Sequence, residues 1–108
     1  MRHARDYARD YARVEKTPTG LALAGVLDYR SGASLREQCR QLLASFQPPV
    51  VVVDCAAVEK ASSVGVSLLL ALSRDAKGAG KVLKVQAMPR DVAQIAEVCG
   101  IRELFETV

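Results

Sequence analysis

The sequence predicts a single α/β domain in which a mixed, mostly parallel β-sheet packs against α-helices. The chain has 108 residues, of which 50% are hydrophobic and 25% charged, as expected for one globular domain with one core. Four consecutive valines, Val50 to Val53, are typical of a strand at the centre of a sheet. Strand-like and helix-like segments alternate in the order β-β-α-β-α-β-α. This alternation favours parallel strands joined by right-handed crossovers, with an antiparallel or mixed edge.

The domain is expected to begin with a pair of strands and a helix. Residues 14–16 and 21–27 form the strands, and the Thr-Pro-Thr-Gly sequence between them forms a turn. After a polar loop, Ser34 and Glu37 fit a capping box, which predicts the start of a helix. Two prolines stop this helix. Its inward stripe is expected to be Leu35, Cys39, Leu42 and Phe46.

The valine strand is expected to end in a polar loop that leads to a second helix, over residues 63–76. Glycines at positions 78 and 80 end this helix. Its inward stripe is expected to be Gly65, Leu68, Leu69, Leu72 and Ala76.

The last third of the chain predicts one more strand, one more helix and a closing turn. The strand covers residues 82–87, Pro89 begins a turn, Asp91 caps the helix and Gly100 ends it. The helix is expected to turn Val92, Ile95, Ala96 and Cys99 inward. The closing turn is expected to cover the core with Ile101, Leu104 and Phe105.

Residues 1–12 are set apart by a tandem Ala-Arg-Asp-Tyr repeat and are expected to form a flexible or partly helical leader to a domain over residues 13–108. Two interpretations remain open. The leader is either a frayed extension or an arm that becomes ordered on a partner or on a second copy.

Composition argues against several classes of protein. A net charge of +3, from 15 Lys and Arg against 12 Asp and Glu, is too small and too evenly mixed to indicate nucleic-acid binding. No apolar run is long enough to span a bilayer, and no signal peptide follows the basic N-terminus, so a cytoplasmic protein is expected. The three cysteines form no close pair and the only histidine is His3, so we expect buried thiols and neither a metal site nor a disulfide.

The sequence also argues against catalysis. A serine nucleophile needs a base within hydrogen-bond reach, and the only histidine lies in the leader. The G-x-S-x-G elbow is absent, and Gly80-Lys81 follows a helix, whereas a phosphate loop precedes one. We therefore expect no enzyme activity, no catalytic residues and no cofactor.

The strongest candidate site is the start of the second helix. Ser63 there is interpreted as a helix cap, as a phosphate-bearing residue or as the centre of a docking surface, because the N-terminal end of a helix is partly positive and has unpaired N–H groups. At 100° per residue, the outward stripe of this helix is expected to be Ser63, Ser67, Leu70 and Arg74. A Leu among small polar side chains on such a stripe favours a contact surface.

The order of elements and the central segment resemble the STAS domain, found in anti-sigma factor antagonists and in sulfate transporter tails. The resemblance covers about residues 14–106, and its strongest part is the valine strand ending in Asp54, followed by Ser62-Ser63-Val64-Gly65 and a leucine run. In that family the junction typically reads Asp-Ser-Ser-Gly-Leu-Gly, and a kinase phosphorylates its first Ser. Alignment on Gly65 places Ser63 at that position, Ser62 at the acidic position and Val64 at the second Ser.

Within this family the chain most resembles the MlaB group, the small cytoplasmic subunits of Mla phospholipid ABC transporters in Gram-negative bacteria. Residues 25–32 and 63–72 carry this narrower resemblance. It implies that the chain binds an MlaF-like ATPase subunit with its permease, reaches the inner membrane only through that complex, and helps to maintain outer-membrane lipid asymmetry. The alternative is an anti-sigma factor antagonist regulated by phosphorylation of Ser63. The expected partner-binding residues are Tyr29, Arg30, Ser62, Ser63, Val64, Ser67, Leu70 and Arg74.

Overall fold

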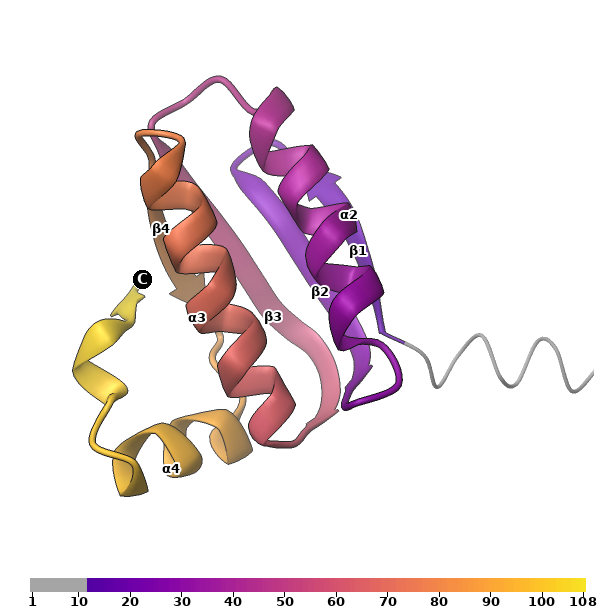
Figure 1. Ribbon diagram of the computed structural model, residues 1–108, viewed down its shortest axis with the longest axis vertical. Helices are drawn as coiled ribbons and strands as arrows, with labels where there is room; N and C mark the ends of the chain where they lie inside the picture. The colour runs from indigo at the N-terminus through magenta and orange to yellow at the C-terminus, as the bar shows by residue number, and fades with distance from the viewer. Residues whose placement is uncertain (1–11) are drawn as a thin grey trace, which may run out of the picture.

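The computed structural model describes residues 12–108 as a five-stranded sheet with helices packed on one face (Figure 1). The strands lie in the order β1-β2-β3-β4-β5, with β1 antiparallel to β2 and the other neighbours parallel. The elements are β1 (Arg13–Thr17), β2 (Gly20–Leu27), α2 (Gly32–Ser45), β3 (Val50–Ala61), α3 (Ser63–Gly78), β4 (Val82–Gln86), α4 (Arg90–Val98), the 3₁₀ helix η1 (Arg102–Leu104) and β5 (Glu106–Thr107). The predicted fold class is confirmed. The leader repeat lies outside the described residues.

Helices α2 and α3 lie side by side over the sheet, and α4 lies at its end beside the first turns of α3 (Figure 1). The side chains between the layers are mostly aliphatic. Val51 and Val53 at the centre of the sheet are fully buried, whereas Val50 is 42% exposed because the other face of the sheet has no helix over it. None of the helices in the described part of the chain is long and apolar enough to cross a membrane.

The β1–β2 hairpin depends on a close backbone approach at Gly20. A Cβ on Gly20 would lie 2.3 Å from the carbonyl oxygen of Val52, so only glycine fits between the hairpin and β3. Strand β2 of the hairpin therefore pairs directly with β3, the central strand of the sheet.

Strand β3 is longer than predicted, because residues 54–61 continue the strand where the sequence indicated a polar loop. The segment pairs in parallel with β2 through two register shifts, and four of its eight side chains are exposed, at positions 56, 57, 59 and 60. The backbone N–H and carbonyl groups of this segment pair with those of β2. The segment can therefore remain a strand without an alternation of apolar and polar side chains.

Helix α2 begins earlier than predicted, and the capping box at Ser34 and Glu37 does not form. A turn after β2 starts the helix at Gly32, with the Ser31 N–H donating to the Asp28 carbonyl at 3.2 Å. Ser34 Oγ instead accepts a hydrogen bond from Gln38 at 3.2 Å, and Glu37 pairs with Arg40 at 2.8 Å. In the inward stripe, Leu42 is only partly buried, and its neighbour Leu43 is buried in the core.

The C-terminal elements depart from the prediction at three residues. Asp91 lies in the first turn of α4 but does not cap it, because Pro89 occupies the N-cap position. Cys99 is exposed, because α4 lies at the end of the sheet and its last turn has no layer to cover. Leu104 is 62% exposed, while Phe105 fills the core and leads into β5.

Candidate docking surface

The two serines at the start of α3 have different roles. Ser62 is the N-cap: its Oγ accepts a hydrogen bond from the Val64 N–H at 3.1 Å, and its own N–H donates to the Leu27 carbonyl at 3.1 Å. Ser63 is the first helical residue and is exposed. Of the three roles considered for Ser63, that of the helix cap therefore belongs to Ser62.

The outward stripe of α3 has the predicted exposure at three of its four positions. Ser63, Ser67 and Arg74 are exposed. Leu70 is only partly exposed and packs against the core cluster, so the predicted outward exposure is only partly correct at this position. The predicted inward stripe of α3 is buried in full.

An open groove of about 340 Å³ lies between the N-terminal halves of α2 and α3. Three predicted site residues, Tyr29, Val64 and Ser67, meet there. The other lining residues are Gly32, Ala33, Arg36, Leu68 and Ala71. Ser63, Leu70 and Arg74 do not line the groove.

Sequence reasoning missed the small residues of the groove. Gly32 and Ala33 open α2, and Ala71 lies one turn after Ser67 on α3. Small side chains at these positions were visible in the sequence, but only the packing of α2 against α3 places them opposite one another. Small side chains at these positions allow another protein surface to approach the two helices closely.

An ion pair joins the two helices beside the groove. Arg36 reaches Asp75 with its Nη2 at 3.2 Å from Oδ1 and its Nε at 3.3 Å from Oδ2. These hydrogen bonds raise the pKa of the Arg36 guanidinium above its usual value. The pair is partly exposed, so its main effect is to fix the position of Arg36 along the rim.

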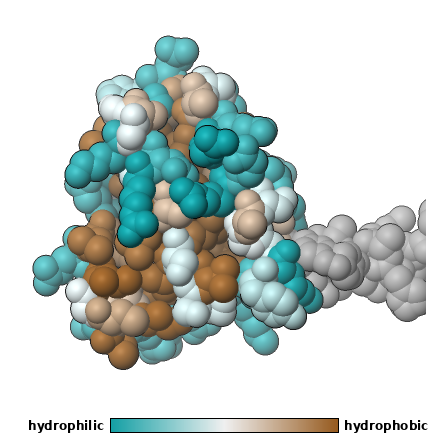
Figure 2. Space-filling model, in the orientation of Figure 1, coloured by the Kyte–Doolittle hydropathy of each residue, from teal (hydrophilic) through white to brown (hydrophobic). Residues whose placement is uncertain are grey.

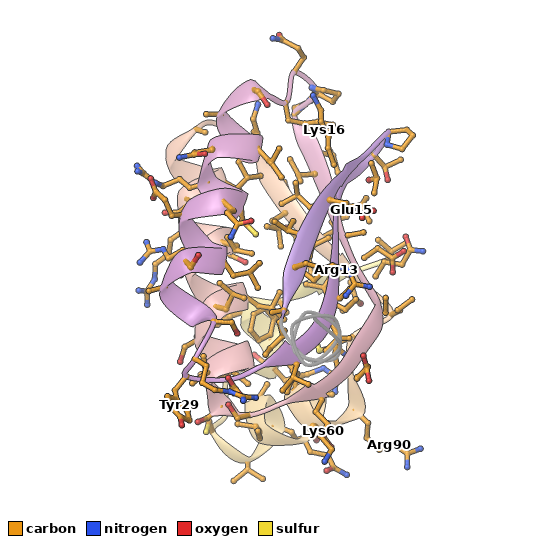
Figure 3. All side chains as sticks on the ribbon, turned by 90° about the vertical axis from the view of Figure 1, so that its right-hand side faces the viewer. Arg13, Glu15, Lys16, Tyr29, Lys60 and Arg90 are labelled. Carbon is orange, nitrogen blue, oxygen red and sulfur yellow. The ribbon has the colours of Figure 1, made fainter. Side chains whose placement is uncertain are left out.

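The loop before α2 presents Tyr29 beside the groove. Arg30 makes a two-point contact with the carboxylate of Asp28, with its Nη2 at 2.8 Å and its Nε at 3.1 Å from Oδ2. Hydrogen bonds from Arg30 lower the pKa of Asp28. The Tyr29 ring is 84% exposed, and Figure 3 shows it at the end of the molecule near the start of α2. Arg30 itself lines a separate hollow of about 160 Å³ with Ser31 and Ser34.

Figure 2 shows that hydrophobic side chains gather over the lower half of this face, where α4 and the first turns of α3 lie. Hydrophilic side chains cover much of the upper half. The groove therefore belongs to a face that combines a hydrophobic region with a hydrophilic one. Such a combination is typical of a protein contact surface.

The described residues offer no catalytic constellation at this surface. Within residues 12–108, no carboxylate or imidazole is hydrogen-bonded to the Ser63 hydroxyl. In the same range, no group of three or more His, Cys, Asp or Glu side chains could hold a metal ion. Asp54, at the end of the valine run, accepts a hydrogen bond from the Ala56 N–H at 2.9 Å and so stabilises its own backbone.

Comparison with solved structures identifies the fold. The anti-sigma factor antagonist SpoIIAA in its unphosphorylated form has a TM-score of 0.68 at 13% identity, over 91% of this chain and 88% of that one. An anti-sigma factor antagonist from Mycobacterium paratuberculosis has the same TM-score at 23% identity, over 90% and 83%. The STAS domain of a SulP transporter from Vibrio cholerae has a TM-score of 0.54 at 18% identity, over 73% and 63%. At these identities the likeness concerns the fold.

The family model described as "Mlab, STAS domain" matches residues 12–106, which is nearly the whole described chain. The strand order, the serine junction before α3 and this match agree with one another. The chain belongs to the STAS domain family.

Proposed function

We propose that this protein is a non-catalytic subunit of an Mla-type phospholipid ABC transporter, in which it binds the ATPase subunit and supports the assembly or activity of the complex. The observation that carries the proposal is the match of residues 12–106 to the family model described as MlaB. In this role the protein is cytoplasmic, contacts the inner membrane only through the transporter, and contributes to outer-membrane lipid asymmetry. It binds neither lipid nor nucleotide itself.

The groove between α2 and α3 supports this proposal because it has the features of a protein contact. Its floor is built from small and aliphatic side chains, and Tyr29 and Arg36 stand at its rim. Tyrosine and arginine are enriched in the energetically important centres of protein interfaces. An apolar side chain of the ATPase subunit would fill the groove, and the tyrosine ring would cover it.

A pull-down with the tagged full-length chain from its host tests the partner class. We expect an ABC-type ATPase and its permease to be recovered together and identified by mass spectrometry. Recovery of a kinase-like anti-sigma factor without any transporter subunit would overturn the proposal.

A second candidate function is that of an anti-sigma factor antagonist. It is favoured by the exposed position of Ser63 at the start of α3, in a fold shared with such antagonists. Phosphorylation would add about −1.5 to −2 charges beside the groove and would oppose docking onto an apolar surface. For the transporter subunit we expect no stoichiometric phosphate on Ser63 in protein purified from its host. An intact mass with one phosphate on most molecules would favour the second candidate.

A further inference from the structure

Strand β1 leaves one edge of the sheet without a partner in the described part of the chain. It pairs with β2 alone, over five residues and without a register shift. Figure 3 looks onto this edge, with Arg13, Glu15 and Lys16 along the strand. An unpaired edge strand is a template for another strand, so the question is which strand fits it.

The backbone of β1 offers its free groups at alternate residues. The Val52 N–H donates to the Thr19 carbonyl at 2.9 Å. Residues 19, 21 and 23 therefore direct their backbone N–H and carbonyl groups toward β3. Residues 20, 22 and 24 direct their backbone groups the other way, toward β1, where they pair with residues 17, 15 and 13. Val14 and Lys16 are left to direct their N–H and carbonyl groups away from the sheet, toward a further strand.

The side chains of β1 divide between the two faces of the sheet. Arg13 and Glu15 lie opposite Ala24 and Ala22, on the face without helices. Val14 and Lys16 lie opposite Leu23 and Leu21, whose side chains are buried under the helices. The open face of the edge thus carries one positive and one negative side chain, whereas the helix side carries Val14 and the positive Lys16.

This pattern is complementary to itself in one register. Consider two copies whose β1 strands pair antiparallel, with the helices of both copies on the same side of the sheet. The residue on the two-fold axis then lies opposite the same residue of the other copy. If that residue is Arg13, Glu15 or Lys16, two like charges face each other. A register centred on Val14 places Arg13 of each copy opposite Glu15 of the other, twice by symmetry. It also makes Val14 the residue that exchanges backbone hydrogen bonds across the axis, as its free groups require.

We propose that β1 pairs with β1 of a second copy in this Val14-centred register, forming a symmetric dimer with one continuous ten-stranded sheet. Opposite charges that face each other across two strands stabilise their pairing, whereas like charges destabilise it. Charged residues often protect an edge strand from pairing. In this register, however, Arg13 and Glu15 each meet a residue of opposite charge, and like charges do not face each other.

The hollow beside α2 provides a place for Lys16. In the same register Lys16 of one copy lies opposite Ala12 of the other, on the side of the helices. Ala12 lines the hollow of about 160 Å³ together with Ser31, Ser34, Leu35, Gln38 and Arg30. The Arg30 guanidinium there is paired with the carboxylate of Asp28 at 2.8 Å. Hydroxyl and amide oxygens there can accept hydrogen bonds from a lysine ammonium. The dimer leaves the docking groove open, because the groove lies between α2 and α3.

Two charge-reversal variants of the full chain test the register. Arg13→Glu places two carboxylates opposite each other on each side of the axis, and Glu15→Arg places two guanidinium groups there. Each variant alone should dimerise at least about tenfold more weakly than the wild type in sedimentation equilibrium at low salt. An equimolar mixture of the two should form heterodimers, because each strand then meets its complement. The double variant R13E/E15R should recover the wild-type dimerisation.

The same measurements can overturn the proposal. A wild-type chain that remains monomeric at millimolar concentration would do so, and so would a dimer that neither single variant weakens. Failure of the mixture to associate better than its components would exclude the Val14-centred register. Both substitutions are at exposed positions, and thermal melts of each variant should match the wild type. The ATPase is not needed, so this result is independent of the proposed transporter role.

Discussion

Two adjacent serines at the start of α3 differ in what they contribute. The Ser62 hydroxyl accepts a hydrogen bond from the Val64 N–H, whereas the Ser63 hydroxyl faces solvent. Ser62→Ala should therefore lower the free energy of unfolding by about 1 kcal/mol, which is roughly 4 °C in Tm for a domain of this size. Ser63→Ala is the matched control and should leave Tm nearly unchanged. Equal losses in the two thermal melts would mean that the helix is capped from Ser63.

The three thiols should differ in reactivity. Burial raises the pKa of Cys39 and of Cys55 from 9.0 to about 12, whereas Cys99 is exposed. Since the thiolate is the reactive form, an alkylating reagent at about pH 8 should label Cys99 in the folded protein and leave the other two unmodified. Denaturation should make all three accessible. Peptide mass spectrometry gives the answer directly, and labelling of Cys39 at the rate of Cys99 would contradict the described packing.

At the scale of single residues, the sequence predicts burial well only where the helix faces a complete layer. All five predicted inward residues of α3 are buried, because this helix lies over the middle of the sheet. Cys99 was expected to be buried and is exposed, because α4 reaches beyond the sheet. Leu70 is less exposed than expected, because its side chain packs against the core cluster. Hydrophobic periodicity predicts which face of a helix is turned toward the core, but it does not predict which other elements cover the rest of the helix.

At the scale of the elements, the hairpin depends on a glycine that cannot be replaced. A methyl group at Gly20 would meet the Val52 carbonyl at 2.3 Å, whereas one at Gly78, in the last turn of α3, would meet nothing within 4 Å. Gly20→Ala should therefore destabilise the domain by several kcal/mol or prevent it from folding. Gly78→Ala should be neutral or stabilise it by up to about 1 kcal/mol. Denaturant unfolding of the pair measures the difference, and similar midpoints would contradict the close approach of β2 to β3.

Element order was predictable, and element boundaries were less so. The alternation of apolar strands and amphipathic helices is a local pattern, and it predicted each of the main strands and helices. The extension of β3 to Ala61 was missed because its polar side chains are exposed, so that only pairing with β2 keeps the segment extended. The capping box of α2 was wrong because a turn at Asp28 starts the helix three residues earlier than the motif suggests, with Ser31 and not Ser34 at the N-cap.

At the scale of the whole molecule, the docking surface is a product of packing. Tyr29 and Ser67 were expected to contact a partner, and the structure brings them to one groove. Gly32, Ala33 and Arg36 complete it from α2, and nothing in their local sequence indicates that α3 lies beside them. The family resemblance predicted the region around Ser63, but the groove is displaced from that residue toward α2. We propose that this groove binds the ATPase subunit.

Co-purification of variant chains with the ATPase subunit measures whether the groove is the binding site. Ser67→Glu places a negative charge at an exposed position in the groove, where a helix tolerates glutamate well. Gln47→Glu adds the same charge to the exposed loop after α2, at the other end of that helix. Both variants should melt like the wild type, because neither side chain is buried.

Ser67→Glu should lose the ATPase, because a charge buried in an interface without a partner costs several kcal/mol, whereas Gln47→Glu should retain it. Recovery of the ATPase with Ser67→Glu at the wild-type level would contradict the claim that the α2–α3 groove is the docking site.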